Sequence, residues 1–139
     1  MTNKIELSWK GDMRFESVAP EGSFFIDAAP GSGGQGNGLR PKALMLSSLA
    51  GCTGMDIASL LKKMRAEVDD FKIDVEANLT AEHPKYYDRV KVTYRFYGSD
   101  LKKSRIEKAV KISEEQYCGV MEMFRQFAEV STEIIYIEQ

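Results

Sequence analysis

The chain has 139 residues, of which 43% are hydrophobic and 29% charged. This composition is typical of a globular domain and excludes disordered, collagen-like and membrane classes, and the length predicts one domain over residues 1–139. The 19 Lys and Arg against 21 Asp and Glu give a net charge of −2. Nucleic acid is therefore not an expected partner, because no basic excess is available to bind phosphates.

The two cysteines, Cys52 and Cys118, are the residues with the most reactive chemistry. The first residues lack the apolar stretch of a signal peptide, and no run reaches the roughly 18 apolar residues of a membrane span. We therefore expect a cytoplasmic protein without membrane contact, in which these cysteines are free thiols or a transient redox pair. They and His83 are far apart in sequence and form no local ligand pair, so neither a metal site nor a cofactor is expected.

The first half of the chain predicts strands followed by one long helix. Short apolar or alternating runs between Ile5 and Ile26 indicate three antiparallel strands, and the glycine-rich stretch Ala29–Arg40 indicates a loop. Pro41 to Arg65 contains no further proline and ends in cations, which predicts a helix. Apolar residues surround much of this helix, so we expect a second copy of the chain to cover part of it.

The second half predicts a hairpin, a helical region and a last strand. Residues 71–79 and 90–96 alternate between apolar and polar. A helical stretch with Asp100 as candidate N-cap follows and is interrupted at Cys118-Gly119, and Glu133–Ile137 is the final strand. This order describes an α+β domain.

One glycine pattern in the loop matches a nucleotide-binding motif only formally. Gly31, Gly33 and Gly36 fit G-x-G-x-x-G, but Pro30 precedes them and no βαβ series follows. The better interpretation is a flexible loop that is covered by a partner or that covers a substrate.

The long helix carries a polar stripe on an otherwise apolar surface. At 100° per residue, Ser48, Cys52, Asp56 and Ser59 lie close together. Gly51 and Gly54, costly inside a helix, leave space for another element or a small ligand. The alternative is a small-residue packing face with a buried, inert thiol.

Two segments carry a resemblance to a known family. Gly38–Cys52, with Gly51–Asp56 (Gly-Cys-Thr-Gly-Met-Asp) and the later Tyr-Cys at Cys118, resembles the OsmC/Ohr family of osmotically induced and organic-hydroperoxide-resistance proteins. The resemblance implies an OsmC-like fold and an intertwined homodimer with thiol sites at its interface. It further implies reduction of alkyl or fatty-acid hydroperoxides, with Cys52 as peroxidatic and Cys118 as resolving cysteine, and Arg14 as the organising arginine.

The sequence departs from the family pattern at two positions. Lys42 stands where the family has a glutamate, and Gly119 replaces a proline. Cys52 lies about eleven residues into its helix and gains little from the helix dipole, so we expect Arg14 to stabilise its thiolate and to pair with Asp56 as well. Without that glutamate to orient it, a looser Arg14, or one turned to Asp56, would make the peroxidase weak. Cys118, at the interruption of the second helical region, is an alternative nucleophile if a new helix begins there and makes it the more acidic thiol.

Two functions remain open at this point. The first is a peroxidase that closes a Cys52–Cys118 disulfide and is reduced by a thiol, for which a lipoyl-type dithiol is one candidate. The second is a weakly active or non-catalytic protein that holds a lipid-like molecule in an interface pocket. The predicted pocket residues are Met45, Ser48, Leu49, Asp56 and Phe124.

Overall fold

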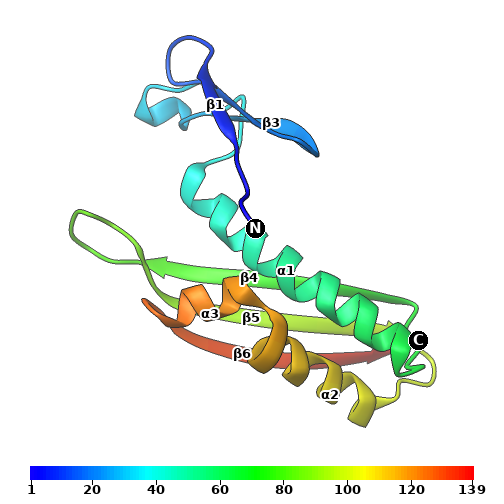
Figure 1. The fold of residues 1–139 in the computed structure, drawn as a ribbon. Coiled ribbons are helices and arrows are strands. Elements are labelled where there is room, and N and C mark those ends of the chain that lie inside the picture. The colour runs from blue at the N-terminus through cyan, green and yellow to red at the C-terminus, as the bar shows by residue number, and fades with distance from the viewer. The chain divides into compact units, whose positions relative to one another are not determined.

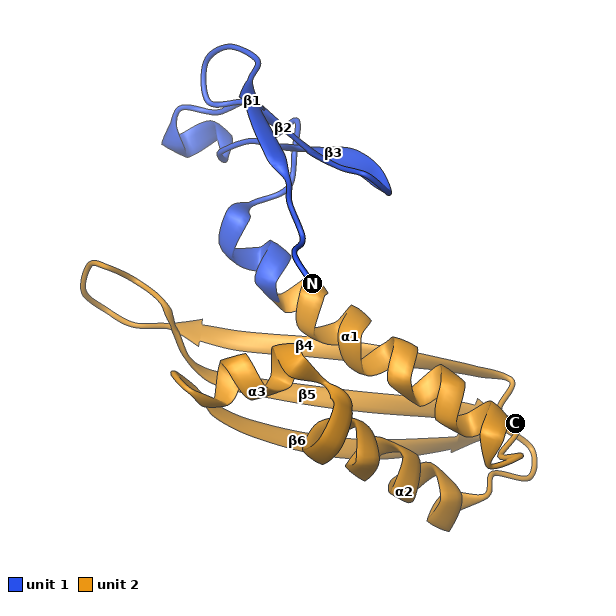
Figure 2. Ribbon diagram, viewed as in Figure 1, with its two compact units in different colours: residues 1–45 blue, residues 46–139 orange.

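A computed structural model describes all residues, 1–139 (Figure 1). The chain forms two compact units, residues 1–45 and residues 46–139, coloured separately in Figure 2. The boundary lies inside the first helix, between Met45 and Leu46. The α+β class and the predicted order of elements are confirmed, whereas the single domain over the whole chain stays a prediction.

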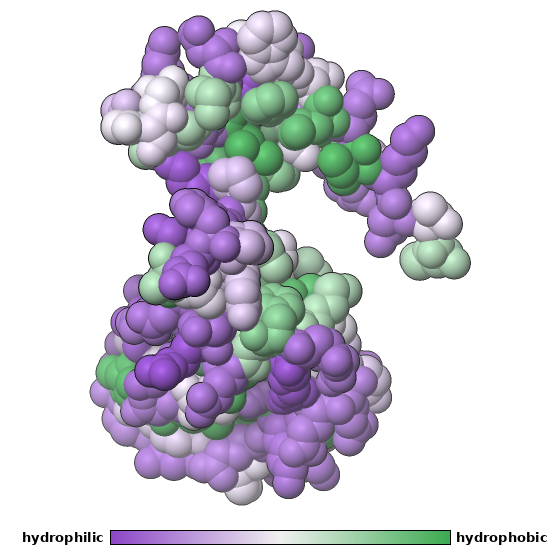
Figure 3. All heavy atoms as spheres, turned by 90° about the vertical axis from the view of Figure 1, so that its left-hand side faces the viewer, coloured by the Kyte–Doolittle hydropathy of each residue, from purple (hydrophilic) through white to green (hydrophobic).

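Unit 1 is a small antiparallel sheet followed by the glycine-rich loop. Strands β1 (Glu6–Trp9), β2 (Phe15–Ala19) and β3 (Gly22–Ile26) pair in chain order, and the short 3₁₀ turn η1 (Pro30–Ser32) lies in the loop. Its only fully buried residues are polar, Ser17 and Asp27. Figure 3 shows apolar side chains gathered on its surface; the exposed ones include Ile5, Leu7, Trp9, Phe24 and Leu39. Unit 1 therefore lacks a hydrophobic core of its own.

Helix α1 (Pro41–Lys63) matches the predicted long helix closely. Arg65, expected to be its last residue, instead lies beyond its end with a φ of 55°. By length and composition alone, helix α1 could cross a membrane, since it has 23 residues and a mean hydropathy of 1.4. Its buried residues nevertheless pack into the core of unit 2, so its apolar character is explained in part by that packing: Leu49, Thr53, Ile57 and Leu61.

The sheet of unit 2 has the order β4-β5-β6. β4 (Asp70–Leu79) and β5 (Tyr87–Gly98) form the predicted antiparallel hairpin. β6 (Glu129–Glu138) pairs in parallel with β5 and begins four residues before the predicted strand. A parallel neighbour needs a crossover connection, and the second helical region supplies it.

That region consists of α2 (Lys103–Ile112), the π-helical turn η2 (Ser113–Tyr117) and α3 (Gly119–Arg125). The predicted interruption at Cys118-Gly119 is confirmed. Asp100 is not the N-cap, because α2 begins three residues later and the Asp100 carboxylate pairs with Lys102 at 2.9 Å.

The core of unit 2 lies between its helices and one face of its sheet (Figure 1). Alternate residues of β5 are fully or almost fully buried there: Val90, Val92, Tyr94 and Phe96. This core holds α1 and the crossover helices side by side above β5, and so fixes the two cysteine-bearing segments relative to each other.

Candidate functional site

Helix α1 supplies two groups of the site from one face. Cys52 and Asp56 are four residues apart and therefore lie one turn apart on the helix. Both are half-buried, whereas Ser48 and Ser59 at the ends of the predicted stripe are exposed. The centre of the stripe thus faces the crossover helices, and its ends face solvent.

Cys118 comes from the junction between η2 and α3. It is the N-cap residue of α3, and its sulfur accepts a hydrogen bond from the Met121 N–H at 3.3 Å. Its own N–H donates to the Ser113 carbonyl oxygen at 2.8 Å, which closes the π-helical turn. Only 3% of Cys118 is exposed, so its thiol points into the protein and is fixed on both sides.

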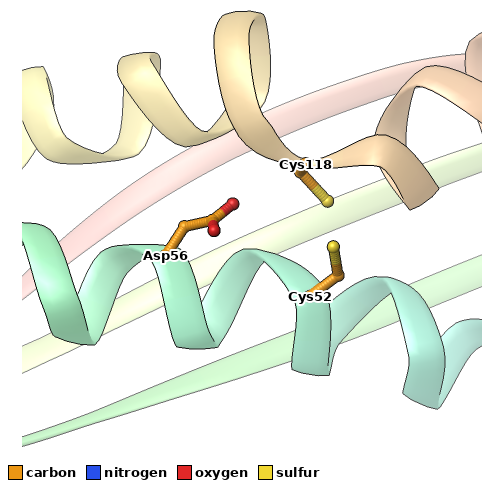
Figure 4. Close-up of side chains that lie close together, drawn as sticks. All are labelled: Cys52, Asp56 and Cys118. Atoms are coloured by element: carbon orange, nitrogen blue, oxygen red, sulfur yellow. The ribbon is translucent and has the colours of Figure 1, made fainter. Parts of the chain in front are cut away.

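The fold brings the three groups together. The sulfurs of Cys52 and Cys118 and a carboxylate oxygen of Asp56 all lie within 4.8 Å of one another, and Figure 4 shows the side chains pointing toward each other. The Cys118 thiol hydrogen-bonds with Cys52. The buried Ser113 hydroxyl donates to Asp56 Oδ2 at 2.9 Å and holds that carboxylate in place.

Burial and negative neighbours keep the Cys118 thiol protonated. Burial is the largest cause that raises the pKa of Cys118, to about 12. The Met121 N–H acts in the opposite direction, and Cys52 and Asp56 add to the increase. Burial therefore argues against the alternative that a helix N-terminus makes Cys118 the attacking thiol, because one backbone donor does not offset the desolvation of its thiol. The assignment of the attacking thiol stays a prediction.

A tyrosine and a threonine beneath the thiols were not predicted. The Tyr94 hydroxyl on β5 is buried without a hydrogen-bond partner within bonding distance. Burial raises the pKa of Tyr94 above its ordinary value, with Glu114 and Cys118 adding to it and Thr53 opposing it. The Thr53 hydroxyl itself donates to backbone carbonyls one turn earlier in α1. Periodicity identified Tyr94 only as an apolar position.

Arg14 and Lys42 both belong to unit 1. Arg14 directly precedes β2, and its guanidinium carbon lies 3.9 Å from the centre of the Phe25 ring. Lys42 is exposed in the first turn of α1. The role of Arg14 as the cation of the thiol site stays a prediction.

The other predicted pocket residues differ in exposure. Met45 is 43% exposed, whereas Leu49 and Phe124 are at most 1% exposed and belong to the core. Leu49 and Phe124 therefore pack in the core and do not present a surface to a ligand within one chain. Next to the site, the surface hollow that has Asp56 in its wall measures about 240 Å³ and is lined by Met55, Asp56, Ser59, Leu60, Lys63 and Tyr117.

The glycine-rich loop is ordered around a buried carboxylate rather than flexible. Asp27 accepts hydrogen bonds from the backbone N–H groups of Ala28, Gln35 and Asn37 at 2.8–3.2 Å. The Asn37 N–H is the largest cause that lowers the pKa of Asp27. A Cβ at Gly34 would clash with the Ala28 carbonyl oxygen, so glycine is required there. Because Asp27 already occupies these donors, they are not available to a phosphate.

Comparison with known proteins agrees with this architecture. The chain matches the family model described as "OsmC-like protein" over residues 34–133. It is 28% identical to Protein YhfA of Escherichia coli K12 over 91 residues, covering 66% of this chain and 68% of that protein.

Solved structures share the fold over nearly the full length. A hypothetical protein from Aquifex aeolicus has a TM-score of 0.88 and 29% identity, with 100% of this chain and 98% of that chain covered. The organic hydroperoxide resistance protein OhrB of Bacillus subtilis has a TM-score of 0.65 and 20% identity, with 96% and 98% covered. The family match spans well over half of the chain, and the fold is that of its relatives: the protein belongs to the OsmC-like family.

Proposed function

We propose that this protein reduces organic hydroperoxides with Cys52 and Cys118 as a redox pair. The observation that carries the proposal is the pair of thiols within 4.8 Å of each other, one half-buried and one buried. Membership of the OsmC-like family, with fold neighbours named for hydroperoxide resistance, favours a redox or peroxide-related function.

The two cysteines differ in burial, and this difference supports a division of roles. Cys52 is the attacking residue because it is the less buried of the two, while the buried Cys118, whose raised pKa keeps its thiol protonated, is the resolving residue. The Cys52 thiolate attacks the terminal peroxide oxygen, and the O–O bond breaks. Cys52 becomes a sulfenic acid, and the alkoxide takes up a proton to leave as an alcohol.

The second step closes the disulfide. Cys118 loses its proton and attacks the Cys52 sulfur, which releases the sulfenic oxygen as water. Asp56 is the carboxylate within reach of that proton, since its oxygen lies within 4.8 Å of the Cys118 sulfur. An external dithiol, with the lipoyl type as a candidate, then exchanges with the disulfide and returns both thiols.

A homodimer is part of this proposal. OsmC/Ohr family members are typically dimeric, and unit 1 carries exposed apolar residues without a core of its own. Exposed apolar residues gathered on one small unit are typical of a surface that binds another protein. We infer that a second copy covers this surface and the exposed part of α1, with the thiols near the interface and Arg14 as their cation. A cytoplasmic location fits free thiols.

Peroxide consumption tests the proposal. Reduced protein is mixed with cumene hydroperoxide or hydrogen peroxide in the presence of a dithiol and EDTA. We expect faster consumption of the organic peroxide and its loss in Cys52→Ser. When the dithiol is left out, Cys118→Ser should consume one equivalent and leave Cys52 as a trappable sulfenic acid. Equal consumption by wild type and Cys52→Ser would contradict the proposal.

Binding of a lipid-like ligand without turnover is the second candidate. The hollow beside Asp56 favours it, because Met55, Leu60 and Tyr117 supply an apolar lining and Lys63 a cation. A fluorescent fatty acid that binds wild type and Cys52→Ser equally, without peroxide consumption by either, would support this function over the first.

A further inference from the structure

The cluster of Cys52, Cys118 and Asp56 has the composition of a metal site as well as that of a redox site. Two thiolates and one carboxylate are a donor set that suits Zn²⁺, with three protein ligands and a fourth position open. The sequence predicted no metal site because the two cysteines and His83 are far apart in sequence and form no local ligand pair. The fold provides the proximity that the spacing does not.

The positions of the three donors fit a tetrahedral ion after a small closure. Zinc lies about 2.3 Å from thiolate sulfur and about 2.0–2.2 Å from carboxylate oxygen, which places neighbouring donors about 3.5–4 Å apart. The donors here lie within 4.8 Å of one another. Cys52 and Asp56 share one helix face a turn apart, so rotation of their side chains alone brings them toward an ion between α1 and Cys118 (Figure 4).

The charge at the cluster favours a cation. Asp56 is hydrogen-bonded to the Ser113 hydroxyl and forms no ion pair within residues 46–139. The cluster thus holds one carboxylate and two ionisable thiols and no basic side chain among its three donors. A divalent ion would neutralise the carboxylate and stabilise both thiolates at once.

Hydrogen bonds from neighbouring groups hold two of the three ligands in position, as they do in known metal sites. The Ser113 hydroxyl fixes Asp56 at 2.9 Å, and the Met121 N–H fixes the Cys118 sulfur at 3.3 Å. The hollow with Asp56 in its wall gives an ion a path from solvent.

We propose that the reduced protein binds one Zn²⁺ per chain through Cys52 Sγ, Cys118 Sγ and the Asp56 carboxylate. Binding forms two zinc–sulfur bonds and one zinc–oxygen bond and releases the two thiol protons. The site uses the same sulfurs as the proposed peroxidase but does not require that activity. Zinc-loaded protein is protected from peroxide, because both sulfurs are bonded to zinc. The disulfide form does not bind zinc, because its two sulfurs are bonded to each other.

Titration of the reduced protein with Co²⁺, and competition for Zn²⁺ with a coloured chelator, test the site without peroxide. We expect one equivalent of Co²⁺ to give a thiolate-to-cobalt charge-transfer band with the intense visible bands of four-coordinate cobalt. Cys52→Ser and Cys118→Ser should abolish the charge-transfer band or shift it. Asp56→Asn should weaken Zn²⁺ affinity by about tenfold or more. Asp100→Asn, which removes an exposed carboxylate of the same unit, is the matched control and should bind as wild type does.

Two results would overturn the inference: absence of the charge-transfer band in reduced wild type, or Zn²⁺ affinity unchanged in a folded Cys52→Ser variant. Circular dichroism establishes that each variant is folded. Peroxide consumption measured in EDTA separates this inference from the proposed function. If consumption is absent while zinc binds, only the peroxidase is refuted; if consumption is present while cobalt gives no band, only the metal site is.

Discussion

Gly51 in α1 offers a direct test of the proposed dimer. It lies inside the helix and is exposed, and a Cβ at this position would meet no atom within 4 Å. Alanine is about 1 kcal/mol more favourable than glycine in a helix interior. Gly51→Ala should therefore stabilise an isolated subunit by about 1 kcal/mol.

The expected result in the dimer is the opposite. If a partner subunit packs closely on this face of α1, the added methyl group meets it, and overpacking costs about 1–3 kcal/mol. After subtraction of the helix gain, Gly51→Ala should leave the dimer unchanged or destabilise it by up to about 2 kcal/mol. Gly54→Ala is the matched control, because its Cβ would touch Ile73 Cδ1 of the same subunit at 3.4 Å.

Urea unfolding at several protein concentrations, with sedimentation at the same concentrations, measures both effects. The change in the free energy of unfolding caused by Gly51→Ala should depend on protein concentration, and the change caused by Gly54→Ala should not. A gain of about 1 kcal/mol at every concentration, with unchanged sedimentation, would show that this face of α1 is open to solvent and would refute the reasoning.

Three further predictions concern the loop, the thiols and Tyr94. Gly34→Ala should lower the melting temperature measured by circular dichroism, because its Cβ would also lie 2.7 Å from Asp27 Oδ1; an unchanged melting temperature would mean that the loop adapts freely. The raised pKa of Cys118 favours the protonated thiol in the folded state. The free energy of unfolding measured in urea should therefore be constant near neutral pH and fall as pH rises above about 8.5, and this fall should be smaller in Cys118→Ser. Tyr94→Phe should leave the free energy of unfolding in urea unchanged or raise it by up to about 1 kcal/mol, since the buried hydroxyl has no partner within hydrogen-bonding distance; a clear loss would indicate that its interaction with the Thr53 side chain stabilises the fold.

Hydrophobic periodicity was sufficient for most of the fold. The three early strands, the long helix, the hairpin and the break at Cys118-Gly119 were predicted because each shows in the spacing of apolar residues along a short segment. The parallel pairing of β6 with β5 was not predicted, since pairing depends on the path of the crossover helices. Asp100 was assigned as an N-cap on residue type alone, and its carboxylate turned instead to Lys102.

The site was predictable only where one element carries it. The stripe that joins Cys52 to Asp56 follows from helix geometry. Pairing with Cys118 came from the family resemblance, because no local pattern links positions so far apart. Ser113 and Tyr94 had no signal beyond one small polar residue and one apolar position. Asp27 had a signal that was missed: an acidic residue directly before a glycine-rich loop, where free backbone N–H groups attract a carboxylate.

The charge of Asp56 connects the two proposals and makes them separable. Asp56 is the carboxylate beside the thiols, and it forms no ion pair within residues 46–139. The proposed Arg14 and the proposed Zn²⁺ would each neutralise this carboxylate, so we expect them to compete. Arg14→Ala should therefore slow peroxide consumption in EDTA and, in the same preparation, tighten Zn²⁺ binding in the chelator competition. A variant that slows peroxide consumption and weakens zinc binding together would mean that Arg14 acts on the stability of the fold, and a variant that changes neither would place Arg14 outside the site, stacked on Phe25.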